Sequence, residues 1–201
     1  MPYWVWIIIG VVVVVLLVLL VTALLRRNRT TALKARFGPE YDRTVSDAGQ
    51  REGETILRSR EQHRDRLNIR PLDPDHREQF LGRWREIQHT FVDQPSRAVR
   101  DASALLTEVM SRRGYPVDNF DERAELISVD HPLLVQDYRV AQGIRERNSR
   151  NQATTEELRE ALLRYRSLFA ELLDSDSSGD DAQPDSRQPR HTRQQNGVDE
   201  R

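Results

Sequence analysis

The chain has 201 residues, no cysteine, and 31 basic against 32 acidic side chains, which gives a formal charge of −1. The lack of cysteine excludes disulfide bonds, thiolate zinc sites and cysteine nucleophiles. The even balance of charge argues against nucleic acid as a partner, and the apolar residues outside the N-terminal segment suffice for only one small core, which argues against a large multidomain enzyme.

The first predicted element is a transmembrane helix over residues 3–25. This segment carries no charge and is apolar except for Gly10 and Thr22. At about 1.5 Å per residue, a helix of this length covers the roughly 30 Å hydrocarbon core of a bilayer. The run is too long for the apolar part of a cleaved signal peptide, and no charged side chain precedes it.

A basic juxtamembrane segment is predicted over residues 26–36. Arg26, Arg27 and Arg29 are the first charged residues after the apolar run, and no acidic residue occurs before Glu40. Because basic residues concentrate on the cytoplasmic side, we expect a single-pass protein of the plasma membrane with its helical part in the cytoplasm. The arginines either contact anionic lipid as well or act only as the topology signal.

Residues 37–72 are predicted to form a polar helical spacer. Apolar residues are few between Ser46 and Leu67, while charged pairs such as Glu54 and Arg58 stand in helical i,i+4 relation. A helix that is polar on all sides has little tertiary support, so a partly disordered stalk is the alternative.

Residues 73–173 are predicted to form a small helical bundle. Asp73-Pro74 suits the N-cap and first position of a helix with one apolar face centred on Trp84. A second helix is expected to start at Asp93-Gln94-Pro95 and to end at Gly114, so that two antiparallel helices follow each other.

Three further helices complete the predicted bundle, and the first of them is a short helix in the segment Phe120 to Ile127. Asp130-His131-Pro132 is interpreted as another cap-and-proline start, for a helix from Leu133 to about Arg147. That helix has two apolar stripes, which indicates either a central position in the bundle or one stripe reserved for a partner. Thr154 and Glu157 form a predicted capping box for the last helix.

The composition changes again at the C-terminal end. Residues 174–201 lack an apolar cluster and are predicted to be a disordered tail. The predicted fold class is therefore all-α: an N-terminal transmembrane helix, a small soluble helical bundle and a disordered tail, with no period-2 strand pattern.

No motif points to catalysis, a metal or a cofactor. The chain lacks the phosphate-binding, dinucleotide-binding and zinc-protease signatures. Glu86 and His89 have the spacing of di-iron ligands in bundles, but both point away from the face of Trp84 and no second such pair exists. His131, next to Asp130, suits a helix start better than a general base. We therefore predict no catalytic, cofactor-binding or metal-binding residue.

Apolar residues outside the predicted core faces are a better guide to function, because they suit a surface that binds another protein. The candidate partner surface consists of Leu133, Val140, Ile144 and Leu163. The alternative is that another helix of the same domain covers these residues.

Several short motifs distributed along most of the chain form a recognisable set. They are Phe37-Gly38-Pro39-Glu40-Tyr41-Asp42, Arg70-Pro71-Leu72, Trp84, Phe91-Val92-Asp93 with Pro95, Arg113-Gly114-Tyr115-Pro116, Ser128-Val129-Asp130-His131-Pro132, Tyr138-Arg139 and the Thr154 to Leu173 helix. With these motifs the chain resembles a family of uncharacterised single-pass membrane proteins from high-GC Gram-positive bacteria. The resemblance implies an anchored helical domain and no established activity.

The leading functional hypothesis is a membrane-anchored helical module that binds an unidentified protein as an adaptor or scaffold. The alternative is a membrane-tethered ligand sensor or enzyme with a site between helices near His131, Tyr138 and Arg139. A closed polar pocket at Tyr138 and Arg139 would favour the alternative, whereas a solid apolar bundle would count against it.

Overall fold

The computed structural model describes residues 4, 14, 16, 17, 20 and 30–174. These residues form helices, turns and loops without a strand, which confirms the predicted all-α class. No helix within them is long and apolar enough to cross a membrane. The predicted transmembrane helix over 3–25 and the predicted disordered tail over 174–201 lie almost wholly outside the described residues.

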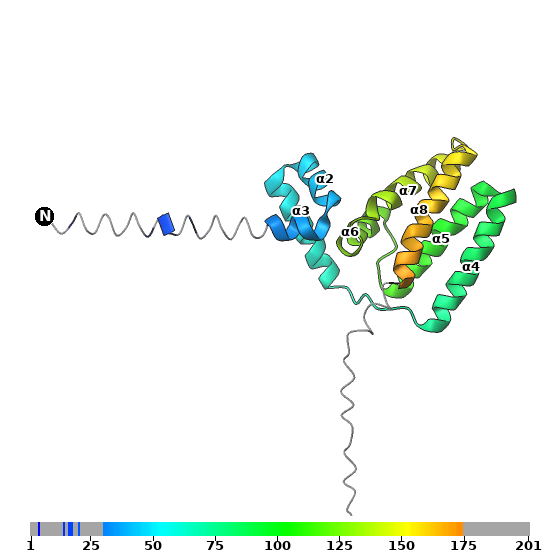
Figure 1. Cartoon of the computed structure of the whole chain (residues 1–201), viewed down its shortest axis with the longest axis horizontal. Coiled ribbons are helices and arrows are strands. Elements are labelled where there is room, and N and C mark those ends of the chain that lie inside the picture. Colours follow the sequence, from blue (N-terminus) through cyan, green and yellow to red (C-terminus); the bar gives the residue numbers. More distant parts are fainter. Residues whose placement is uncertain (1–3, 5–13, 15, 18–19, 21–29, 175–201) are drawn as a thin grey trace, which may run out of the picture.

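Helical residues 30–37 precede seven helices in the described part of the chain. Their bounds are α2 (Pro39–Ala48), α3 (Gln50–Asp65), α4 (Pro74–Asp93), α5 (Pro95–Arg113), α6 (Phe120–Asp130), α7 (Val135–Ser149) and α8 (Thr155–Asp174). The order in space differs from the order in sequence, because each helix packs on the next in the series α2, α3, α6, α7, α8, α5, α4 (Figure 1).

The main core lies between α4, α5, α6, α7 and α8. Trp84 of α4 stacks on Phe169 of α8 with ring centroids 4.7 Å apart, and Tyr138 of α7 meets the ring of Tyr165 of α8 at an edge. The predicted apolar face of α4 is buried, since Phe80, Trp84 and Ile87 all belong to this core. Burial of such large side chains stabilises the fold by about 1.5–3 kcal/mol each, offset by chain entropy.

Three helix ends follow the predicted sequence signals. The Asp73 carboxylate accepts a hydrogen bond from the backbone N–H of His76 at the start of α4. Thr154 and Glu157 form the expected reciprocal capping box before α8, with backbone to side-chain hydrogen bonds of 2.8 and 3.3 Å. Gly114 ends α5 in the left-handed conformation at φ 97°, which a glycine adopts without steric cost.

The segment predicted as a polar spacer, residues 37–72, folds back on itself. Gly49, at φ 81°, separates α2 from α3, and the two helices pack side by side. A second small core consists of Leu33, Phe37, Tyr41, Leu57 and Val129. The few apolar residues of this segment are therefore enough for a helical hairpin because they gather on one side and use Val129 of α6. We call residues 30–65 the N-terminal unit.

The Asp130-His131-Pro132 motif has a different role from the predicted helix start. Asp130 is the last residue of α6, His131 follows it at φ −134°, and α7 begins only at Val135. Gln94 before Pro95 has the same φ of −134° between α4 and α5. In both places the residue before proline is kept out of the helical region. The Asp130-His131-Pro132 motif therefore ends α6 and does not cap α7. The prediction that Asp130 caps α7 is wrong.

Candidate functional site

The four residues of the predicted partner surface are divided between surface and core. Leu133 and Leu163 are 74% and 56% exposed. Val140 is half-buried against the main core, and Ile144 is 2% exposed within it. Because α7 contacts α5, α6 and α8, its second apolar stripe is largely covered by the same chain. The assignment of Ile144 to a surface is therefore corrected.

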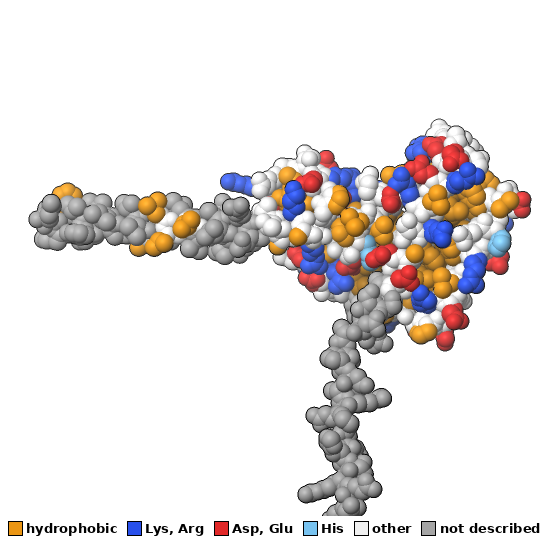
Figure 2. Space-filling view, in the orientation of Figure 1, with side chains coloured by type: hydrophobic (Ala, Val, Ile, Leu, Met, Phe, Trp, Pro, Cys, Tyr) orange, Lys and Arg blue, Asp and Glu red, His pale blue; other side chains and the backbone are white. Residues whose placement is uncertain are grey.

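The exposed apolar side chains are interspersed with charges. On the face drawn in Figure 2, hydrophobic side chains form small separate groups among arginines and acidic residues. Beside Leu163, Arg164 pairs with Glu160 at 2.6 Å and also contacts Asp137 of α7. A partner that binds at Leu163 would therefore contact one apolar side chain surrounded by charged side chains. A small apolar centre with a charged rim is the usual composition of a transient interface.

His131, Tyr138 and Arg139 do not converge on one site. The Tyr138 ring is in the main core and its hydroxyl accepts a hydrogen bond from Arg123 Nε at 3.2 Å. His131 Nδ1 lies 3.3 Å from a carboxylate oxygen of Glu171. Arg139 points to the N-terminal unit instead. The residues named for a sensor or enzyme thus make three separate sets of contacts.

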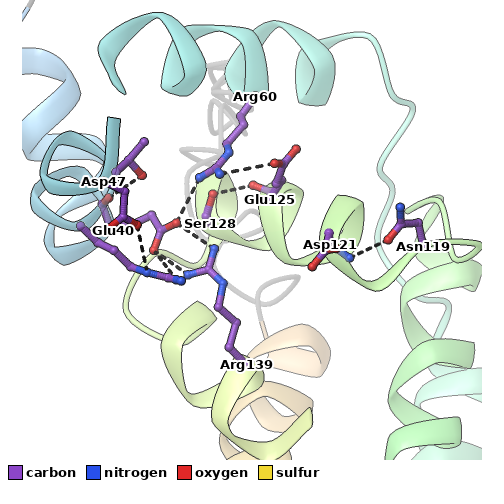
Figure 3. Close-up of polar contacts among 10 residues, drawn as sticks. Glu40, Asp47, Arg60, Asn119, Asp121, Glu125, Ser128 and Arg139 are labelled. Atoms are coloured by element: carbon purple, nitrogen blue, oxygen red, sulfur yellow. Dashed lines mark hydrogen bonds and ion pairs between the residues drawn. The ribbon is translucent and has the colours of Figure 1, made fainter. Parts of the chain in front are cut away.

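A polar cluster that joins distant parts of the chain surrounds the buried Glu40. Arg139 of α7 donates to both of its carboxylate oxygens, at 2.7 and 2.8 Å, and Arg60 of α3 donates at 3.1 Å. Figure 3 shows the two arginines approaching Glu40 from opposite sides. Arg60 also reaches Glu125 of α6 at 3.4 Å. The cluster therefore connects four helices, α2 and α3 of the N-terminal unit with α6 and α7 of the bundle.

The electrostatics of this cluster favour the charged form of Glu40. The residue is only 4% exposed, and burial alone would raise its pKa. The hydrogen bonds and positive charges of Arg139 and Arg60 outweigh burial, so the pKa of Glu40 lies below its ordinary value. A cavity of about 170 Å³ opens beside the cluster and is lined by Arg43, Asp47 and Ile56 among others.

A second polar cluster surrounds Asp130 at the end of α6. Arg64 Nε donates to one of its carboxylate oxygens at 2.7 Å, and the Tyr115 hydroxyl donates to the other at 2.6 Å. Burial, with the nearby Asp130 charge, raises the pKa of Tyr115 well above its ordinary range. The hydroxyl therefore stays a donor. This cluster, like the one at Glu40, joins the N-terminal unit to the bundle.

Sequence reasoning did not identify Glu40 as part of a site, although a signal was present. Phe37, Glu40, Tyr41 and Thr44 are all buried and follow the i, i+3, i+4, i+7 spacing of one helix face. An acidic residue on an apolar face indicates a buried carboxylate that needs a basic partner. The identity of the partners, Arg60 and Arg139, is not encoded in any local spacing.

Comparisons with protein-family models, curated proteins and solved structures give no match. Among the described residues, no group of three or more histidine or acidic side chains is arranged to hold a metal ion. Function is therefore argued from the geometry of this chain.

Proposed function

We propose that the chain is a membrane-anchored helical module that binds another protein close to the inner face of the plasma membrane. The anchor is the uncharged segment 3–25, with Arg26, Arg27 and Arg29 at the lipid headgroups. The helical part is assigned to the cytoplasm, because the basic residues lie on that side of the apolar run.

The observation that carries this proposal is the packing of helical residues 30–37, which overlap the end of the juxtamembrane segment. Leu33 and Phe37 are buried in the small core together with Leu57 of α3. Thr30 donates a hydrogen bond of 2.7 Å to Glu54, also on α3. A folded unit therefore begins a few residues after the proposed anchor, which would hold the bundle near the bilayer in a defined orientation.

The contacts between the N-terminal unit and the bundle support the same proposal. Pairs from α2 and α3 to α6 and α7 include Arg64 with Asp130 and Arg139 with Glu40. We call this set, with Arg60–Glu125 and His63–Glu122, the polar interface. Fixed orientation of a surface relative to the membrane is what an adaptor needs, because binding to a second membrane-bound protein then costs less ordering.

Leu133 and Leu163 are the proposed contact residues for the partner. Both are large, apolar and exposed, and truncating an exposed side chain does not disturb the core. The sensor or enzyme alternative gains no support from the positions of His131, Tyr138 and Arg139, which take part in separate internal contacts.

In-cell photo-crosslinking of the full-length chain tests the proposal. A photoreactive residue at Leu133 or Leu163 should capture one protein in near-stoichiometric amount, whereas the same residue at the exposed Val92 of α4 should not. Leu163→Glu should abolish capture from a photoreactive residue at position 133, and Leu133→Glu should abolish capture from one at position 163, without changing the circular dichroism melting curve. Deleting residues 3–25 should also abolish it.

Equal capture at Val92, or capture that survives both glutamate substitutions, would contradict the assigned surface. A protease-protection assay with a C-terminal tag tests the topology separately, since a tag protected inside the cell supports the cytoplasmic assignment.

A further inference from the structure

A cavity of about 340 Å³ lies where the loop between α3 and α4 passes the end of α5. It is lined by Arg70, Pro71, Leu72, Asp73, His76 and Arg112. It is separate from the polar interface and from Leu133 and Leu163. Volumes of this order are typical of small-ligand sites.

The two arginines are brought together by fixed backbone contacts. The N–H of Arg70 donates to the carbonyl oxygen of Arg113 at 2.9 Å, and Leu72 packs on the main core. At Gly114 the loop comes so close that an added Cβ would lie 2.5 Å from the carbonyl oxygen of Asn68. The loop therefore holds Arg70 beside the last turn of α5, which carries Arg112.

The acidic residue of the cavity is already engaged. One oxygen of Asp73 accepts the backbone N–H of His76 at 3.0 Å, and the other contacts the Nδ1 of the same histidine. Neighbouring Arg77 pairs with Asp174 at 2.7 Å, outside the cavity lining. The cavity is thus lined by two exposed arginines and by one carboxylate that serves as the cap of α4.

We propose that this cavity binds a phosphate monoester group through Arg70 and Arg112. Guanidinium groups offer paired N–H donors that match the oxygens of phosphate, and the charge of two of them exceeds that of the single opposing carboxylate, Asp73. The group belongs either to a soluble metabolite or to a lipid headgroup such as that of phosphatidic acid. The proposal is independent of the protein partner.

The test uses the full-length chain in phosphatidylcholine nanodiscs titrated with inorganic phosphate by isothermal titration calorimetry at constant ionic strength. We expect saturable binding that Arg70→Gln and Arg112→Gln each weaken at least tenfold, about 1.4 kcal/mol. Arg112→Lys, which keeps the charge but loses the paired donors, should fall between. The control is Arg100→Gln, an exposed arginine on α5 outside the cavity, which should bind as the unaltered chain does.

Nanodiscs that contain phosphatidic acid distinguish the two sources. A lipid headgroup in the cavity should compete and weaken the binding of inorganic phosphate, while unchanged binding points to a soluble ligand. Either result supports a phosphate site. Absence of saturable binding, or equal binding by Arg70→Gln, Arg112→Gln and the unaltered chain, overturns the proposal. Thermal melting of each variant verifies that it is folded before titration.

Discussion

Arg139 of α7 holds both carboxylate oxygens of Glu40 on α2, a pair that joins the N-terminal unit to the bundle. Burying a carboxylate costs free energy unless basic groups and hydrogen bonds compensate it. Here Arg60 supplies a second guanidinium. One carboxylate shared by two arginines therefore contributes to the orientation of the N-terminal unit, together with the Arg64–Asp130 pair.

Glu40→Gln removes that charge while keeping the size of the side chain. Arg60 and Arg139 then remain mostly buried without their carboxylate. We expect the free energy of unfolding to fall by about 3–5 kcal/mol, the usual effect of breaking a buried pair. Chemical denaturation of the full-length chain in detergent micelles, followed by circular dichroism, measures this change.

The matched control for Glu40 is Asp42→Asn on the same helix. Asp42 pairs with Lys34 at 3.2 Å, but both side chains are exposed. Exposed pairs contribute about 0–1 kcal/mol, so the loss should be small. If Glu40→Gln and Asp42→Asn lower the free energy of unfolding equally, the buried pair of Glu40 and Arg139 contributes no more to stability than the exposed pair of Asp42 and Lys34 does.

Two glycines give a prediction of opposite sign. Gly114→Ala should destabilise the fold by more than about 1 kcal/mol, because φ is 97° and the new Cβ would clash with the Asn68 carbonyl oxygen. Gly82→Ala, inside α4 with nothing within 4 Å of the added Cβ, should stabilise it by about 0.5–1 kcal/mol. Melting temperatures of the two variants should therefore move in opposite directions, and a shared direction would contradict the structure.

The sequence alone predicts those helix ends and buried faces that depend on residues close together in the chain. The Asp73 cap, the Thr154 and Glu157 capping box and the Gly114 stop each rest on hydrogen bonds or conformations within one turn. The apolar periodicity around Trp84 likewise identified the buried face of α4. Such features require only the residue types and their spacing.

Features that depend on distant contacts could not be obtained in this way. The Asp130-His131-Pro132 motif predicts a cap at Asp130, yet the oxygens of Asp130 accept hydrogen bonds from Arg64 and Tyr115, which come from other parts of the fold. The helical spacing places Ile144 off the core face, but α7 contacts three other helices and Ile144 is buried among them. In both cases the competing effect is tertiary packing, which spacing within one helix does not record.

The stacked pair of Trp84 and Phe169 predicts a large loss of stability when the Trp84 ring is removed. Trp84→Ala removes the ring that joins α4 to α8 and should lower the free energy of unfolding by about 3–5 kcal/mol. The control on the same helix is Val92→Ala, at a position that is 81% exposed, with an expected change within about 0.5 kcal/mol. A thermal melt of Trp84→Ala that matches the unaltered chain would contradict the packing described.

His131 predicts how stability depends on pH. Burial lowers its pKa below the ordinary 6.5 and outweighs the opposing effects of Glu171 and Asp130. As the pH falls, the unfolded chain therefore takes up this proton first, so stability is fully present above 6.5 and is lost as the pH falls through the folded pKa. His131→Gln should flatten the dependence of the unfolding free energy on pH as the pH falls below 6.5. Glu171→Gln removes a carboxylate that raises the pKa of His131, so this variant should steepen the dependence of the unfolding free energy on pH. If the unfolding free energy of His131→Gln changes with pH as it does in the unaltered chain, His131 is not the titrating group.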